Sequence, residues 1–222
     1  MRRLSIPFNE EFVELISGQY RQPQWKTFSP VAHVPCLHDS SESPPLVLWE
    51  SIAIVEHLAE QHPEKSIYPT TSKAARAWAR SAVAEMHAGF ATIREEMSMN
   101  IGLRVQFEEK GEVGEQLGKE LSRVSELWTE GLTRFGGPWL AGGEFTAVDA
   151  FFAPVVLRVQ TFVGSRAWLS EEADKYVERV LGIEELREWV GLALEETGRE
   201  TLHEGDTIRG RRILEDLRVG EQ

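Results

Sequence analysis

Apolar side chains recur at every third or fourth position over most of the second half of the chain. This period is that of an α-helix with one buried face, and four such stripes in succession predict amphipathic helices packed in a bundle. We therefore expect an all-helical domain over residues 72–205, followed by a charged, loosely packed tail at 206–222. The stripes are Trp78, Ala82, Met86, Phe90, Ile93 and Met97; Leu117, Leu121, Val124, Trp128 and Phe135; Val148, Phe152, Val155, Val159 and Phe162; and Ile183, Leu186, Val190 and Ala193.

The first 69 residues have a different pattern: short segments that alternate between strand-like and helix-like spacing, and most of the prolines. Their patterns predict a β-α-β-β-α order, so the expected fold class is an α/β domain over 1–69 followed by the all-α domain. The polar stretch 61–72, with two prolines, is the predicted linker. The predicted elements are a strand at 8–15, a short helix at 22–30, strands at 34–39 and 45–49 joined by a turn, and a helix at 51–61.

Charge and composition exclude several classes of protein. The 222 residues carry a net charge of −12, which argues against a nucleic-acid partner or an anionic membrane surface. The apolar runs are too short to span a membrane. The single cysteine excludes an internal disulfide and indicates a reducing, cytoplasmic location. His33 and His38 have no third ligand at metal spacing, so no metal site is expected.

The segment FTAVDA, residues 145–150, has the pattern of a helix N-terminus. Thr146 and Asp149 have the spacing of a capping box, in which each residue satisfies a backbone amide of the other. An apolar face follows at once, so we interpret both residues as structural rather than catalytic.

Two short motifs in the first part point to ligand binding. Pro35 interrupts an apolar run in VPCL, where it removes a donor from a strand, and the only cysteine, Cys36, follows it. In WES, at 49–51, a strand gives way to a helix whose N-terminus favours a bound carboxylate. Ser51 is the expected N-cap, and the alternative is that it only caps its own helix.

The segment 85–104 carries three of the four methionines together with polar side chains. Methionine side chains are flexible and can adapt to apolar ligands of different shapes, so Met86 and Met97 are candidates to line a cleft. Ordinary packing in the core is an equal alternative for both. Arg94, Asn100 and Arg104 are candidates to orient a ligand there, although exposed charges are usually only solvated.

Together these segments resemble a known family. PVAHVPCLHDSS…LVLWESIAIVEHLAEQHPEKSIYP is similar to the N-terminal thioredoxin-like domain of glutathione S-transferases, and GPWLAGGEFTAVDAFFAPVV resembles part of their helical domain. The resemblance runs over roughly residues 5–195 and is nearest to soluble bacterial and fungal members of zeta-like type.

The resemblance implies roles for particular residues. Val34–Pro35 would be a cis bond that presents the backbone of Val34 to the cysteinyl part of glutathione. Glu50 and Ser51 would hold the γ-glutamyl end, and His33 would lie near the glycyl or cysteinyl end. Cys36 matches no catalytic position and would pack as a small apolar group.

The start of the chain departs from the family pattern. RRLSIPFNEEFVEL resembles the end of the family's first helix and its second strand. The first strand and the loop with the catalytic Ser, Tyr or Cys are therefore expected to be missing, and the catalytic residue is unknown. Either an upstream segment carries the missing part, or the chain is a short form with reduced activity.

The expected function is addition of the glutathione thiolate to an apolar electrophilic small molecule, or a glutathione-dependent isomerisation, in detoxification or biosynthesis. Glutathione would act as cosubstrate, without a metal, in a homodimer formed across helices 51–61 and 72–100. The alternative is a non-catalytic binding or assembly module of the same fold. A thiol oxidoreductase using Cys36 is a poor third reading, because the chain has no partner cysteine.

Overall fold

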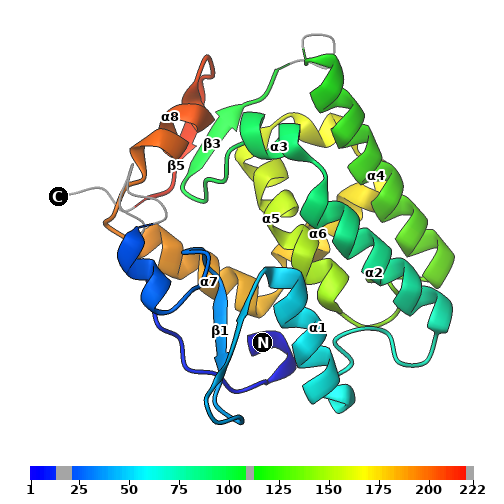
Figure 1. Ribbon diagram of the computed structural model, residues 1–222. Coiled ribbons are helices and arrows are strands. Elements are labelled where there is room, and N and C mark those ends of the chain that lie inside the picture. The colour runs from blue at the N-terminus through cyan, green and yellow to red at the C-terminus, as the bar shows by residue number, and fades with distance from the viewer. Residues whose placement is uncertain (14–21, 109–112, 219–222) are drawn as a thin grey trace.

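The computed structural model describes residues 1–13, 22–108 and 113–218. It shows a small thioredoxin-type α/β part followed by a larger helical part, as the sequence predicted (Figure 1). Among the described residues, no helix is long and apolar enough to cross a membrane.

In its described residues, the α/β part contains two antiparallel strands and one α-helix. Strands β1 (Cys36–Asp39) and β2 (Leu46–Trp49) form the predicted hairpin, and α1 spans Ser51–Gln61, the predicted bounds. A 3₁₀ helix at Pro23–Thr27 occupies the place of the predicted short helix. The predicted strand at 8–15 is wrong for residues 8–13, which have no regular secondary structure, and its last two residues lie outside the described part. The acidic side chains of this segment are better solvated in water than on a buried strand. Phe12, which follows them, has 74% of its surface exposed.

The hairpin is fixed on both faces because side chains alternate along β1. On one face, the thiol of Cys36 donates to the carbonyl of Phe28 at 3.3 Å, and Nε2 of His38 lies 2.7 Å from the same oxygen. On the other face, Oδ2 of Asp39 lies 2.8 Å from Nε2 of His57 in α1. The hairpin is therefore held between the 22–30 segment and α1.

Acid should loosen the contact between the hairpin and α1. Hydrogen bonds from Ser41 and His57 lower the pKa of Asp39 to about 2, so its stabilising contribution is present at neutral pH and is lost as the pH falls through that value. We expect Asp39→Asn to lower the melting temperature at pH 6, and the difference from the wild type to shrink steadily below about pH 4. Thermal scans by circular dichroism across this range test it, and a difference independent of pH would contradict it.

The helical part contains seven α-helices in its described residues. They are α2 (Lys73–Ala88), α3 (Ala91–Glu96), α4 (Glu115–Phe135), α5 (Ala147–Thr161), α6 (Glu171–Leu181), α7 (Glu184–Glu195) and α8 (Thr201–Ile208). The first apolar stripe is divided between α2 and α3, because the helix is interrupted at Gly89 and Phe90. Phe90 has a φ of 56° there, which is not the conformation of a right-handed helix. Of the fourth stripe only Ile183, the N-cap of α7, is buried, and no residue within the helix itself is, so α7 lies at the edge of the bundle.

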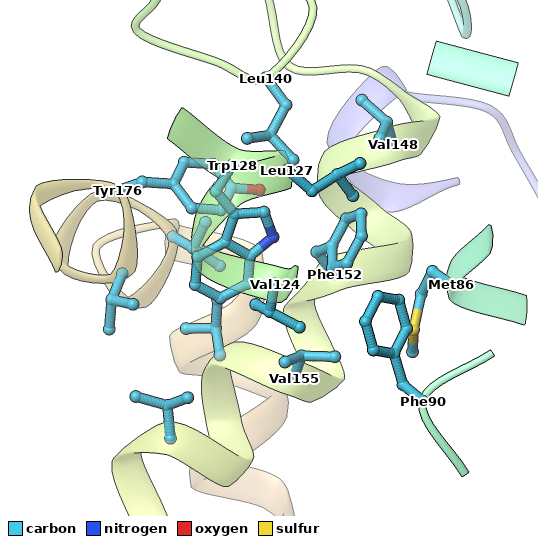
Figure 2. Packing of buried hydrophobic residues seen from close by; sticks show 14 of the residues in the cluster. Met86, Phe90, Val124, Leu127, Trp128, Leu140, Val148, Phe152, Val155 and Tyr176 are labelled. Atoms are coloured by element: carbon cyan, nitrogen blue, oxygen red, sulfur yellow. The ribbon is translucent and has the colours of Figure 1, made fainter. Parts of the chain in front are cut away.

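The core of the bundle is built around Trp128 of α4 (Figure 2). Its ring is fully buried and packs edge-on against Phe152 of α5, with 5.8 Å between centroids, and against Tyr176 of α6, with 5.1 Å. Three helices, α4, α5 and α6, therefore contact one another at a single side chain.

A small sheet at the edge of the bundle was not predicted. Its order is β4-β3-β5, with β3 at Leu103–Gln106, β4 at Phe162–Val163 and β5 at Ile213–Asp216. The expectation of a loosely packed tail is thus wrong for 213–216, since β5 pairs antiparallel with β3. Ion pairs fix this end of the chain: Arg211 binds Glu108 at 3.0 Å, and Arg218 binds Glu204 at 2.7 Å.

Candidate functional site

The open end of the β1–β2 hairpin brings together the two motifs that the sequence singled out. Cys36 pairs with Trp49 as the last pair of the ladder. The residues beyond it are therefore neighbours, with Val34–Pro35 on one side and Glu50–Ser51 on the other. The bond between Val34 and Pro35 is cis, as expected, and Val34 is exposed.

Helix α1 begins at this point with free donors. The N-cap is Glu50, so the prediction that Ser51 occupies this position is wrong; Ser51 is the first helical residue. The carbonyl of Glu50 accepts from Ile54 at 3.1 Å, and the amides of the three residues before Ile54 have no acceptor within the helix. These amides and the helix dipole favour a bound carboxylate. Glu50 has a φ of 68°, a left-handed conformation that is uncommon outside glycine and concentrates at functional sites.

A histidine from the helical part lies beside the same helix start. Nε2 of His87, in the last turn of α2, is 3.5 Å from Oε2 of Glu50. Both side chains are partly exposed, so the pair contributes little to stability. Sequence reasoning missed His87, because nothing local links it to a residue 37 positions earlier.

His33 precedes the cis bond and is half-buried. Its amide donates to Oγ of Ser29 at 3.2 Å, which fixes the backbone just before Val34. The structure thus brings His33, Val34, Pro35, Glu50 and Ser51 to one end of the α/β part.

Comparison with known proteins identifies the fold that contains this site. Residues 1–61 match the family model described as the glutathione S-transferase N-terminal domain. This chain has the glutathione S-transferase fold. The solved structure of Ure2p in complex with glutathione is 19% identical with a TM-score of 0.59, over 82% of this chain and 86% of that one. Glutathione transferase URE2P5 from Phanerochaete chrysosporium is 17% identical with a TM-score of 0.61, over 87% of each chain. Glutathione transferase F2 from Populus trichocarpa is 18% identical with a TM-score of 0.57, over 79% and 81%.

Within this glutathione S-transferase fold, the residues predicted to line a second binding site serve the fold itself. Met86 and Met97 are buried in the hydrophobic core, so the core-packing alternative holds for both. Arg94 donates to the carbonyls of Met86, at 3.2 Å, and Gly89, which caps the end of α2. Oδ1 of Asn100 accepts from the amide of Leu103 at 2.9 Å. All four residues thus have packing or capping contacts, and their role as contacts of an electrophile stays a prediction.

The capping box at the start of α5 is confirmed, and its carboxylate does more than cap. Oδ2 of Asp149 accepts from the amide of Thr146 at 2.9 Å, while Oδ1 accepts from the amide of Leu140 at 3.0 Å and the hydroxyl of Tyr176 at 3.2 Å. The carboxylate is fully buried. Burial raises the pKa of Asp149 to about 6, against the opposing effect of these hydrogen bonds. Asp149 therefore ties α5 to α6 and to the loop before it.

Cys36 has the environment of a structural thiol. It is partly buried, it donates to a backbone carbonyl, and burial raises its pKa. A thiol with a raised pKa is a poor nucleophile at neutral pH. The geometry gives no support to a thiol oxidoreductase that uses Cys36.

Proposed function

We propose that this chain binds glutathione at the open end of the β1–β2 hairpin. The observation that carries the proposal is the strand register: Cys36 pairs with Trp49, so Val34–Pro35 and Glu50–Ser51 both follow the same end of the hairpin. Glutathione offers an extended backbone, and its γ-glutamyl end carries an ammonium and a carboxylate group that these residues could bind.

The proposed contacts follow from charge and hydrogen-bonding capacity. The γ-glutamyl carboxylate would accept from the hydroxyl and amide of Ser51 at the positive end of α1. The γ-glutamyl ammonium would pair with the exposed carboxylate of Glu50. The cysteinyl backbone would pair with the N–H and C=O of Val34, and His33 would lie toward the glycyl or cysteinyl end.

The proposed reaction is addition of the glutathione thiolate to an electrophilic carbon of an apolar small molecule, or a glutathione-dependent isomerisation. In this step the thiol loses its proton to solvent and its sulfur forms a bond to the electrophilic carbon. At the same time a π bond at that carbon breaks and the product takes up a proton, or a leaving group such as chloride departs with the bonding electron pair. In this proposal, residues 1–69 act as the glutathione-binding domain and 72–205 as the domain that holds the electrophile. Pairing of two copies across α1, α2 and α3 would give a homodimer.

The second candidate is a binding module of this fold without catalysis. It is favoured by the engagement of Met86, Arg94, Met97 and Asn100 in packing and capping, which leaves the electrophile without an assigned contact. Glutathione conjugation of 1-chloro-2,4-dinitrobenzene, followed by absorbance, separates the two. Conjugation above the background rate supports the enzyme, whereas glutathione binding without conjugation supports the module.

Ser51→Ala should weaken glutathione binding by about 10- to 100-fold, because a hydrogen bond to a charged group contributes about 1.5–3 kcal/mol. Isothermal titration with glutathione, or retention on immobilised glutathione, measures the effect. Ser81→Ala is the matched control, since Ser81 is exposed on α2 and bonds only the carbonyl of Ala77 at 3.2 Å. Equal retention of the Ser51 variant and the wild type would refute the proposed site.

A further inference from the structure

A second site candidate is a cavity of about 380 Å³. Its lining residues come from β3, the end of α5, the turn after β4, α6 and α7. Three arginines line it: Arg104 from β3, Arg166 from the turn after β4, and Arg187 from α7. Glu178 is the only carboxylate residue in the lining. None of the residues proposed to bind glutathione belongs to it.

The charge of the lining is positive in a chain whose net charge is −12. Arg166 already binds two carboxylates, Glu178 at 2.5 Å and Asp174 at 3.2 Å, so the charge of Glu178 is satisfied within the wall. Among the described residues, Arg104 and Arg187 form no ion pair with a carboxylate within 4.0 Å. Two arginines of the lining are therefore without an ion-paired carboxylate, although Glu215 lies opposite Arg104 in the β3–β5 ladder.

Arg104 carries the strongest argument for a bound anion. It is half-buried, and Nη1 donates to the carbonyls of Ile101 at 3.1 Å and Leu103 at 2.9 Å. Burial lowers the pKa of Arg104, and the charge of Glu215, its cross-strand partner on β5, opposes that effect. A guanidinium removed from water without a paired anion is costly, and an anion entering the cavity would offset that cost.

Arg187 and its neighbours complete the site. Nε of Arg187 donates to the carbonyl of Leu181 at 3.2 Å, which holds the exposed side chain across the end of α6. Leu186 and Val190 of α7 add an apolar surface to the same cavity. The volume lies within the range of about 300–1,000 Å³ that is usual for small-molecule sites.

We propose that this cavity binds a small organic anion, with a carboxylate, sulfonate or phosphate group at Arg104 and Arg187 and an apolar body against Leu186 and Val190. The site is separate from the glutathione site and does not depend on it. A neutral molecule of the same shape lacks the ionic contacts and binds more weakly.

Isothermal titration with naphthalene-2-sulfonate at pH 7 and low salt tests the proposal, with 2-naphthol as the neutral analogue. We expect the sulfonate to bind the wild type at least about tenfold more tightly than 2-naphthol, and Arg187→Gln to weaken it by about fivefold or more. Because Arg187 is exposed, this substitution leaves the core untouched.

Two controls separate this site from general charge and from the hairpin. Arg134→Gln removes the same charge from an exposed position on α4, where Arg134 pairs with Glu130 at 3.1 Å, and should leave sulfonate binding unchanged. Ser51→Ala should also leave it unchanged. Equal binding of 2-naphthol, no effect of Arg187→Gln, no measurable binding to the wild type, or loss of binding in Ser51→Ala would each overturn the proposal.

Discussion

We expect Asp149→Ala to lower the free energy of unfolding by about 3–5 kcal/mol, since each buried donor left without a partner costs about 1–3 kcal/mol. The substitution would leave four donors without this acceptor: the amides of Leu140 and Thr146 and the hydroxyls of Thr146 and Tyr176. All four now converge on one fully buried carboxylate. Urea denaturation followed by far-ultraviolet circular dichroism measures the change at neutral pH.

The matched control is Asp174→Ala on α6. Asp174 is partly exposed and pairs with Arg166 at 3.2 Å, a contact of the kind that contributes about 0–1 kcal/mol. A loss at Asp149 no larger than the loss at Asp174 would show that the buried network does not hold α5, α6 and the 140 loop together.

The second large effect is expected from Gly131→Ala, at a buried position of α4. A β-carbon there would lie 2.5 Å from the carbonyl oxygen of Leu140 and 2.5 Å from the ring of Trp78. Both distances are far below van der Waals contact, and the carbonyl belongs to backbone that cannot rotate away. Overpacking of this kind costs about 1–3 kcal/mol, and the backbone contact places this site in the upper part of that range.

Gly191→Ala on α7 supplies the opposite case. No atom lies within 4 Å of a β-carbon at Gly191, so the substitution adds only helix propensity and should stabilise the protein by up to about 1 kcal/mol. Thermal and urea unfolding of both variants would test the pair. Stabilisation by Gly131→Ala would mean that α4 and the Leu140 loop are not in close contact.

Local signals were enough to predict much of this structure. Helix α1 occupies the predicted residues because a strand, a turn-like Glu50 and an apolar stripe succeed one another within 16 positions. The capping box at Thr146 is equally local. The β1–β2 hairpin was predictable because its two strands are joined by a short polar turn.

The parts that sequence reasoning missed depend on distant contacts. Nothing near Ile213 marks it as a strand, since its partner Val105 lies over 100 residues earlier and the segment around it is highly charged. The contact of Glu50 with His87 likewise exists only in the folded chain. Met97 shows a third limit: a periodic methionine has the same pattern whether it lines a cleft or fills a core.

The pairing of β3 with β5 also has a consequence for how the protein folds. Because β5 follows β3 by over 100 residues, this pairing has a high contact order and forms late. During synthesis, the side of β3 that later receives β5 has no partner until residue 216 has left the ribosome, and such an open edge is prone to wrong pairing with another chain. The pairing of β5 with β3 therefore closes this edge only once nearly the whole chain has been made.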